Sequence, residues 1–193
     1  MTELLLVRHG ETDWNRERRF QGHADPPLNE AGREQARELA DRLFGEDIAA
    51  VYTSDLLRAR ETAEILAAAL DAAVVALREL REIDVGNWQG LTWAEIEERH
   101  PEGAERWHRD GHGWDAGETY DQLGERIVAA LREIASSHAG QRVLIVGHGG
   151  TVRATRAFVE GVSVAESRRR SAAIGNCEVF RLVTEDGTWR GLD

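Results

Sequence analysis

Residues 4–10 read Leu-Leu-Leu-Val-Arg-His-Gly, and this stretch decides the fold. Four apolar residues in a row predict a short strand that is buried on both faces. Arg8 and His9 follow at its carboxyl end, which is the edge where open α/β sheets bind ligands. Gly10 allows the backbone to turn sharply and to approach whatever these two side chains hold. We therefore expect a ligand site at the end of this strand, followed by a helix for which Asp13 is an N-cap candidate.

A second strand candidate ends in the same way. Residues 142–146 are strongly apolar and are followed by a Gly-His-Gly-Gly sequence that contains His148. Because parallel strands present their carboxyl ends at the same edge of a sheet, we expect His9 and His148 to meet there. Backbone N–H groups of the helix that follows Gly149 would face the same edge and favour an anion. One histidine at a strand end is more often a structural residue, but two matched strand ends favour a functional site.

Strand and helix patterns alternate along the chain. Expected strands cover residues 4–7, 48–53, 74–77 and 142–146, expected helices cover 30–45, 55–70, 118–134 and 151–159, and a closing hairpin covers 178–192. This alternation predicts a three-layer α/β/α sandwich with a mostly parallel sheet, to which the hairpin adds an antiparallel edge. No repeat or long linker divides the sequence, so we expect a single domain over residues 1–193.

Residues 92–114 form an expected insertion over the ligand-binding edge of the sheet. Thr92 and Glu95 predict a capping box for a short helix that Pro101 ends. Three glycines then predict irregular structure for the rest of the insertion: Gly103, Gly111 and Gly113. Four tryptophans lie in or beside it: Trp88, Trp93, Trp107 and Trp114. They could wall a pocket, but packing of the insertion onto the sheet is the commoner role for any single tryptophan.

The composition restricts the class of partner. A formal net charge of −11 argues against nucleic acid or an anionic membrane, because no excess of basic residues is available. All 24 basic residues are arginine, which excludes a Walker A lysine and Schiff-base chemistry. No apolar run approaches the roughly 20 residues of a membrane span, and no secretory pattern precedes Arg8. A cytoplasmic location is therefore expected.

Cysteine and histidine patterns give no disulfide or metal site. Cys177 is the only cysteine, so we expect no intrachain disulfide or cysteine-based zinc cluster and a buried thiol within a strand. His108 and His112 have the four-residue spacing of a metal-binding pair on a helix. The neighbouring glycines argue against a helix there, and no third ligand is apparent. We expect these two histidines to be exposed in a loop, and we predict no metal and no other cofactor.

Four segments resemble, in order, the motifs of the histidine phosphatase superfamily, also called phosphoglycerate mutase-like. The first is LVRHGETDWN at residues 6–15, and the second is YTSDLLRARETA at residues 52–63. The third is LREI followed by GNWQG within residues 80–90, and the fourth is VGHGG at residues 146–150. Four ordered motifs are far more specific than Arg-His-Gly alone, and the resemblance covers most of the chain.

The resemblance implies roles for nine residues. His9 would be the nucleophile that becomes phosphorylated, and Glu82 would be the proton donor and later the base. Three further side chains would surround the phosphoryl oxygens: Arg8, Arg58 and His148. Four residues would add hydrogen bonds or lie beside the substrate: Asn15, Gln21, Gly22 and Gly149. No metal is required in this family.

These residue types suit phosphoryl transfer. Guanidinium and imidazole groups can neutralise the spreading charge, and a neutral imidazole is a competent nucleophile at cytosolic pH. Glu79 and Asp84 could be mistaken for Glu82. We select Glu82 because the family pattern places the acid four residues before a glycine, here Gly86.

Arg58 has an alternative interpretation, a helix-surface ion pair with Asp55 or Glu61, each three residues away. An arginine in the first turn of a helix is poorly placed for the helix dipole, and this misfit favours a functional reason.

We expect a metal-independent phosphomonoester hydrolase that acts on a small phosphorylated metabolite through a phosphohistidine intermediate. The alternative is a cofactor-dependent phosphoglycerate mutase, but the insertion is short and lacks the basic, proline-rich character that the resemblance implies for that branch. A non-enzymatic relative that binds phosphorylated partners would lack the nucleophile or the acid, and both are present. The sequence does not name the alcohol part of the substrate, and a homodimer is compatible with it.

Overall fold

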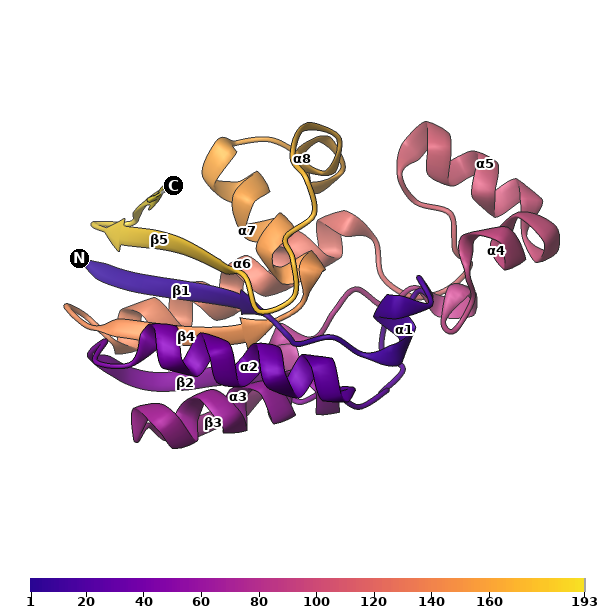
Figure 1. Cartoon of the computed structure of the whole chain (residues 1–193). Helices are drawn as coiled ribbons and strands as arrows, with labels where there is room; N and C mark the ends of the chain where they lie inside the picture. Colours follow the sequence, from indigo (N-terminus) through magenta and orange to yellow (C-terminus); the bar gives the residue numbers. More distant parts are fainter. Residues whose placement is uncertain (193) are drawn as a thin grey trace.

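A six-stranded sheet forms the middle layer of this computed structural model, which describes residues 1–192, the side chain of Asp110 excepted (Figure 1). The strand order is β3-β2-β4-β1-β5-β6. Strands β3, β2, β4 and β1 run parallel, whereas β5 pairs antiparallel with β1, so the predicted sheet is confirmed. The strands are β1 (Thr2–Arg8), β2 (Ile48–Ser54), β3 (Val74–Leu77), β4 (Arg142–Gly147), β5 (Val179–Glu185) and β6 (Thr188–Gly191).

Strand β1 lies inside the sheet, between β4 and β5. Val7 pairs with Val146, and Arg8 pairs with Gly147, so β1 and β4 end side by side. This parallel register brings the residues that follow the two strands, His9 and His148, to the same edge.

Alternate residues of β1 face two separate apolar clusters. Leu4 and Leu6 pack with residues of α6 and α7, whereas Leu5 and Val7 pack with residues of α2 and α3. All four side chains are completely buried, which stabilises the fold by about 1.5–3 kcal/mol for each. Helices cover both faces of the sheet, which confirms the three-layer sandwich. These helices are α2 (Glu30–Leu43), α3 (Leu57–Leu70), α6 (Tyr120–Ser137) and α7 (Gly149–Glu160).

The helices begin within two residues of the predicted positions: α6 begins at Tyr120 rather than at residue 118, and α7 begins at Gly149 rather than at residue 151. Asn29 caps α2, as expected. Helix α1 (Asp13–Arg16) is capped by Thr12 rather than by its own first residue. Helix α3 begins two residues after Asp55, because the Asp55 carboxylate accepts two hydrogen bonds from Arg81 instead of capping the helix.

The insertion is more regular than its glycines suggested. Helix α4 (Trp93–Arg99) has the expected capping box from Thr92 and Glu95. Helix α5 (Pro101–Asp110) occupies residues for which we predicted irregular structure, so that prediction was wrong. The proline that ends α4 is also the first residue of α5, a position where its missing N–H costs nothing. Both helices lie beyond the carboxyl ends of the parallel strands (Figure 1).

The glycines of the insertion provide space for close packing. A Cβ at Gly113 would lie 2.3 Å from the carbonyl oxygen of Gly103 and 2.4 Å from the Trp88 ring. Trp88 is completely buried, which confirms the packing role expected of it. Its ring contacts four other aromatic rings: Phe20, Trp93, Trp107 and Trp114.

Three further features differ from the sequence-based expectation. The short helix α8 (Val164–Arg170) was not predicted, because fewer than two turns leave little periodicity. Cys177 is buried, but in the turn before β5 rather than within a strand. Two single-turn 3-10 helices that were not predicted lie in the connection between β3 and α4: η1 (Arg78–Leu80) and η2 (Gly86–Trp88). Across residues 1–192, no helix combines the length and the apolar character needed to cross a bilayer.

Candidate active site

His9 is buried at the carboxyl end of β1, and each of its ring nitrogens forms one hydrogen bond. Its Nδ1 donates to the carbonyl oxygen of Gly10 at 2.7 Å, since a carbonyl can only accept. Its Nε2 accepts from the Nε of Arg58 at 3.2 Å. Burial, and then the charges of Arg58 and Arg8, hold the pKa of His9 well below 6.5. His9 is therefore a neutral imidazole with the lone pair on Nε2.

Arg58 is completely buried in the first turn of α3. Its Nη1 donates to the carbonyl oxygen of Ala24 at 2.8 Å, and its Nη2 donates to that of Gly22 at 2.9 Å. Burial lowers its pKa to about 10, so it stays cationic at neutral pH. The alternative of a surface ion pair was wrong, because Asp55 pairs with Arg81 and Glu61 with Arg33. Arg58 faces His9 instead.

His148 lies against His9, as the matched strand ends predicted. The centroids of the two rings are 5.3 Å apart, with the rings edge to face. His148 is completely buried, and neither ring nitrogen has a hydrogen-bond partner among residues 1–192. Burial, followed by the charge of Arg58, holds its pKa well below 6.5. An unpartnered buried imidazole is costly, which indicates a place for a polar ligand.

Glu82 points to the same edge from the segment that follows η1. Its Oε1 and Oε2 accept from the backbone N–H of Gly150 at 3.1 and 3.2 Å. A Cβ at Gly150 would lie 2.0 Å from Oε1, so only glycine allows this contact. His23 Nε2 donates to the carbonyl oxygen of Glu82 at 2.9 Å. Arg126 donates to the carbonyl oxygens of Glu79, Arg81 and Glu82.

Arg8 and the backbone of His9 are held by the segment that precedes β5. Arg8 Nη1 donates to the carbonyl oxygen of Ile174 at 2.7 Å. Asn176 Nδ2 donates to the carbonyl oxygen of His9 at 2.8 Å. Burial lowers the pKa of Arg8. Most N–H groups of its guanidinium remain available to an anion.

The four other predicted site residues line the same cavity: Asn15, Gln21, Gly22 and Gly149. The Asn15 Oδ1 accepts from the backbone N–H and the hydroxyl of Thr12. Gln21 Nε2 donates to Thr12 Oγ1 at 3.0 Å. The carbonyl of Gly22 orients Arg58, so this glycine acts partly through its neighbour.

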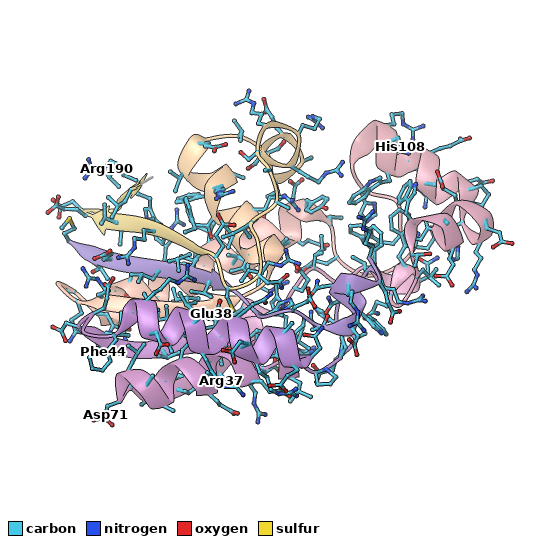
Figure 2. The ribbon with its side chains drawn as sticks, viewed as in Figure 1. Arg37, Glu38, Phe44, Asp71, His108 and Arg190 are labelled. Atoms are coloured by element: carbon cyan, nitrogen blue, oxygen red, sulfur yellow. The ribbon has the colours of Figure 1, made fainter. Side chains whose placement is uncertain are left out.

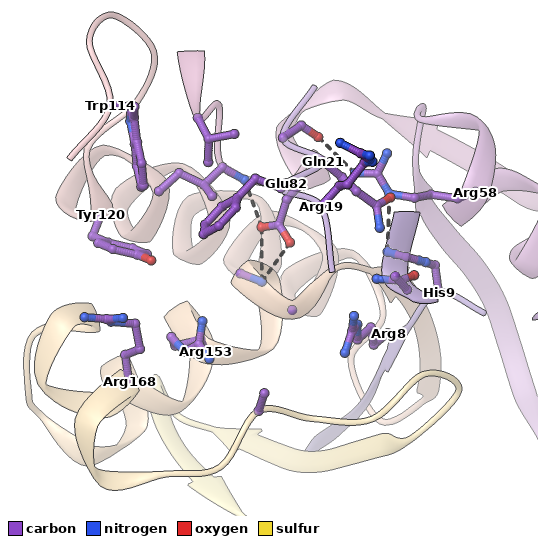
Figure 3. A pocket seen from close by; sticks show the side chains of 18 of the residues that line it. Arg8, His9, Arg19, Gln21, Arg58, Glu82, Trp114, Tyr120, Arg153 and Arg168 are labelled. Atoms are coloured by element: carbon purple, nitrogen blue, oxygen red, sulfur yellow. Dashed lines mark hydrogen bonds between the residues drawn. The ribbon is translucent and has the colours of Figure 1, made fainter. Parts of the chain in front are cut away.

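The cavity has a volume of about 340 Å³ (Figure 3). It extends from His9 and Arg8, past Glu82, to an outer end that the sequence did not predict in detail. Aromatic and basic side chains line this outer part: Phe20, Trp107, Trp114, Tyr120, Arg153 and Arg168. Trp107 and Trp114 thus combine packing with a place in the cavity wall.

Sequence reasoning missed several positioning residues. His23 and Arg126 hold the backbone of the Glu82 segment, Asn176 holds the backbone of His9, and the Thr62 Oγ1 accepts from the N–H of Gly10 at 3.0 Å. Only Thr62 and His23 lie in or near a motif. None of the four has a local signal, because each contacts a residue at least 44 positions away in the sequence.

His108 and His112 do not form the metal pair that their spacing suggested. The exposed His108 ring packs on Trp93, on the outer side of the insertion (Figure 2), whereas the His112 ring packs on Trp114. Helix α5 includes His108, so the expected loop was wrong for that residue. Among residues 1–192, no three histidine, cysteine or acidic side chains are grouped as a metal site.

The comparisons with known proteins agree with this geometry. The family model of the histidine phosphatase superfamily (branch 1) matches residues 4–192. Phosphoglycerate mutase-like protein 4 of Arabidopsis thaliana is 44% identical over 156 residues, which cover 78% of this chain and 68% of that protein. Metal-independent phosphoserine phosphatase of the same plant is 43% identical over 159 residues, which cover 80% and 67%. The structure of Bacillus stearothermophilus YhfR has a TM-score of 0.92 at 34% identity and covers 100% of this chain and 96% of its own. The chain belongs to the histidine phosphatase superfamily.

Proposed function

We propose that this phosphatase hydrolyses the phosphomonoester of a small metabolite, with the Nε2 atom of His9 as the nucleophile. The state of His9 supports this assignment most strongly. Its proton is bound at Nδ1 by the Gly10 carbonyl, and its Nε2 lone pair faces the guanidinium of Arg58. A nucleophile that is neutral, fixed in orientation and surrounded by cations suits attack on a phosphate dianion.

The phosphoryl oxygens are assigned to Arg8, Arg58 and His148. Arg58 uses three of its five N–H groups within the protein, and Arg8 donates to one backbone carbonyl, that of Ile174, so both retain donors for a ligand. The unpartnered His148 would bind a phosphoryl oxygen through one ring N–H. Bidentate guanidinium contacts of this kind stabilise charge on the transferring group.

Glu82 is assigned as the general acid and base. In the first step the His9 Nε2 attacks phosphorus, the ester P–O bond breaks, and the leaving alcohol takes a proton from Glu82. In the second step water attacks the phosphohistidine, the P–N bond breaks, and the proton of water goes to the Glu82 carboxylate. Acid–base assistance of this kind contributes typically ~10²–10⁴-fold to the rate.

The test is hydrolysis of p-nitrophenyl phosphate in the presence of EDTA. The wild-type enzyme should release nitrophenol, and rapid quenching should trap an acid-labile phosphoryl group on the protein. His9→Ala should abolish both, whereas His108→Ala, which removes an exposed histidine from α5, should retain both. Turnover by His9→Ala at the wild-type rate would overturn the assignment.

Phosphoglycerate mutase activity is the second candidate, since one relative is named mutase-like. Incubation with 3-phosphoglycerate, with and without 2,3-bisphosphoglycerate as primer, separates the two activities. A phosphatase releases inorganic phosphate, whereas a mutase accumulates 2-phosphoglycerate. We expect release of phosphate.

We propose a cytoplasmic location, where phosphorylated metabolites are abundant, and fractionation of cells tests it. A homodimer stays a proposal that light scattering on the purified protein tests.

A further inference from the structure

Two arginines at the outer end of the cavity have no place in the phosphoryl transfer described above. Arg153 comes from α7, and Arg168 comes from α8. Figure 3 shows both on the side of the cavity that is remote from His9, with Glu82 between the two ends. The hydroxyl of Tyr120 points into the cavity near them (Figure 3).

Neither guanidinium is paired with an acidic side chain among the described residues. Within residues 1–192, nothing forms a hydrogen bond or ion pair with Arg153. The Nε of Arg168 is buried without a hydrogen-bond partner, and its guanidinium lies 4.1 Å from the centroid of the Trp107 ring. Burial lowers the pKa of Arg168, and the like charge of Arg153 lowers it further. Two unpaired cations that repel each other are costly unless an anion joins them.

The side chains that line the cavity carry an excess of positive charge. Five arginines line it, but Glu82 is the only carboxylate among the described residues that do. Arg19 is paired with Glu17 and Glu95. A phosphomonoester dianion would be matched by the two arginines beside His9. Positive charge at the outer end therefore remains unmatched, in a protein whose net charge is −11.

We propose that Arg153, Arg168 and the Tyr120 hydroxyl form a second anion-binding subsite. The substrate is then a phosphomonoester whose alcohol part carries another anionic group, a carboxylate or a second phosphoryl group. This inference rests on the proposed function, because it places the first phosphoryl group at His9. Burial raises the pKa of Tyr120 to about 12, so its hydroxyl keeps its proton and can donate it to the anion. The rings of Trp107 and Trp114 form the wall beside this subsite.

Two pairs of sugar phosphates test the proposal, because each pair adds one anionic group. Glucose 6-phosphate is compared with 6-phosphogluconate, which adds a carboxylate, and fructose 6-phosphate with fructose 1,6-bisphosphate, which adds a phosphoryl group. The added anion should raise kcat/KM by about 10-fold or more in at least one pair, mainly through KM. The pair that responds identifies the chemistry of the anion.

Arg153→Gln and Arg168→Gln should each reduce that within-pair ratio about 10-fold. Arg169→Gln removes the same charge from the exposed neighbour of Arg168 and should retain the ratio. Arg153→Gln serves as the second variant in case loss of the stacked Arg168 disturbs the insertion, and tryptophan fluorescence detects such a disturbance.

The outcomes separate the two proposals. If p-nitrophenyl phosphate is not hydrolysed by the wild-type enzyme, the proposed function fails. If it is hydrolysed but both pairs show equal kcat/KM, or if neither arginine variant changes the ratio, the anion subsite is overturned and the proposed function stands.

Discussion

The chemistry assigned to His9 depends on one backbone oxygen. The Gly10 carbonyl accepts the Nδ1 proton, which leaves Nε2 as the basic nitrogen, and Gly10 in turn donates to Thr62. The sequence indicated a histidine at a strand end, but the tautomer follows from the local backbone geometry. The tautomer of His148 cannot be read from the sequence either. Neither of its ring nitrogens has a hydrogen-bond partner among the described residues, so the ligand that enters the cavity determines which nitrogen carries the proton.

Protonation of His9 and His148 in the unfolded chain is expected to weaken the fold at acidic pH. Both have pKa values well below 6.5 in the folded protein, because burial disfavours the imidazolium. Below pH 6.5 the unfolded chain binds protons that the folded protein does not, so the free energy of unfolding falls as the pH is lowered. Each histidine contributes up to about 1.4 kcal/mol per pH unit.

Urea unfolding measured between about pH 5 and pH 7.5 checks this dependence, in a range that brackets the ordinary histidine pKa. His148→Gln removes one of the two groups and should flatten the slope, whereas the exposed His108→Gln should leave it as in the wild type. An unchanged slope in His148→Gln would contradict the expectation.

Gly150→Ala is predicted to displace the Glu82 carboxylate, because the new Cβ would lie 2.0 Å from Oε1. For an alkyl phosphate, whose alkoxide needs a proton to leave, kcat should fall by about 100-fold or more. For p-nitrophenyl phosphate, whose phenolate leaves unaided, the loss should be much smaller. Gly191→Ala is the control, since its Cβ would make an ordinary contact at 3.7 Å with Phe180. Equal losses on both substrates would argue against an acid role for Glu82.

At the scale of elements, the insertion depends on close contact between α5 and the chain that returns from it. Sequence reasoning treated Gly103 and Gly113 as breakers of regular structure, yet they allow the backbone to pack on Trp88. A glycine that loosens a loop and a glycine that fits against a ring look the same in a sequence. Only the structure shows that Gly113 packs against Trp88, which lies 25 residues earlier in the sequence.

Gly113→Ala should therefore destabilise the protein by about 1–3 kcal/mol, the usual cost of overpacking. Urea unfolding followed by tryptophan fluorescence measures it. Gly124→Ala on α6 is the matched control of opposite sign: its Cβ would lie 3.4 Å from Val164, and alanine is the better helix former by about 1 kcal/mol. An unchanged free energy of unfolding in Gly113→Ala would show that the insertion shifts to accommodate the added methyl group.

At the scale of the whole molecule, two apolar clusters share one sheet. The larger cluster includes Ile96 and Trp114 of the insertion and the adjacent Trp88, together with Leu4 and Leu6 of the central strand. We therefore expect the insertion to unfold with the sheet, and residues 1–193 stay our proposal of a single domain.

One cooperative transition is the expected outcome. Four of the six tryptophans lie in or beside the insertion, so their fluorescence reports on it, whereas far-ultraviolet circular dichroism reports on all helices and strands. The two signals should change at the same urea concentration. An earlier fluorescence transition would show that the insertion is a separate unit.

The sequence by itself determined the α/β alternation, the buried central strand and the family, because these depend on local apolar patterns and on short motifs. The family and the named phosphatase relative confirm the predicted class of activity. The roles of His9, Glu82 and the other predicted site residues stay proposals, although the structure brings them to one cavity.

Only the tertiary structure decided which distant groups meet at that cavity. Arg58 donates to His9 rather than pairing with Asp55, and His23 donates to the backbone carbonyl of Glu82. Arg153 and Arg168 line the outer end of the cavity, although neither belongs to a sequence motif. The physical reason is that the sequence does not distinguish a charged side chain that is solvated by water from one that binds a ligand. Only the fold determines which groups surround it.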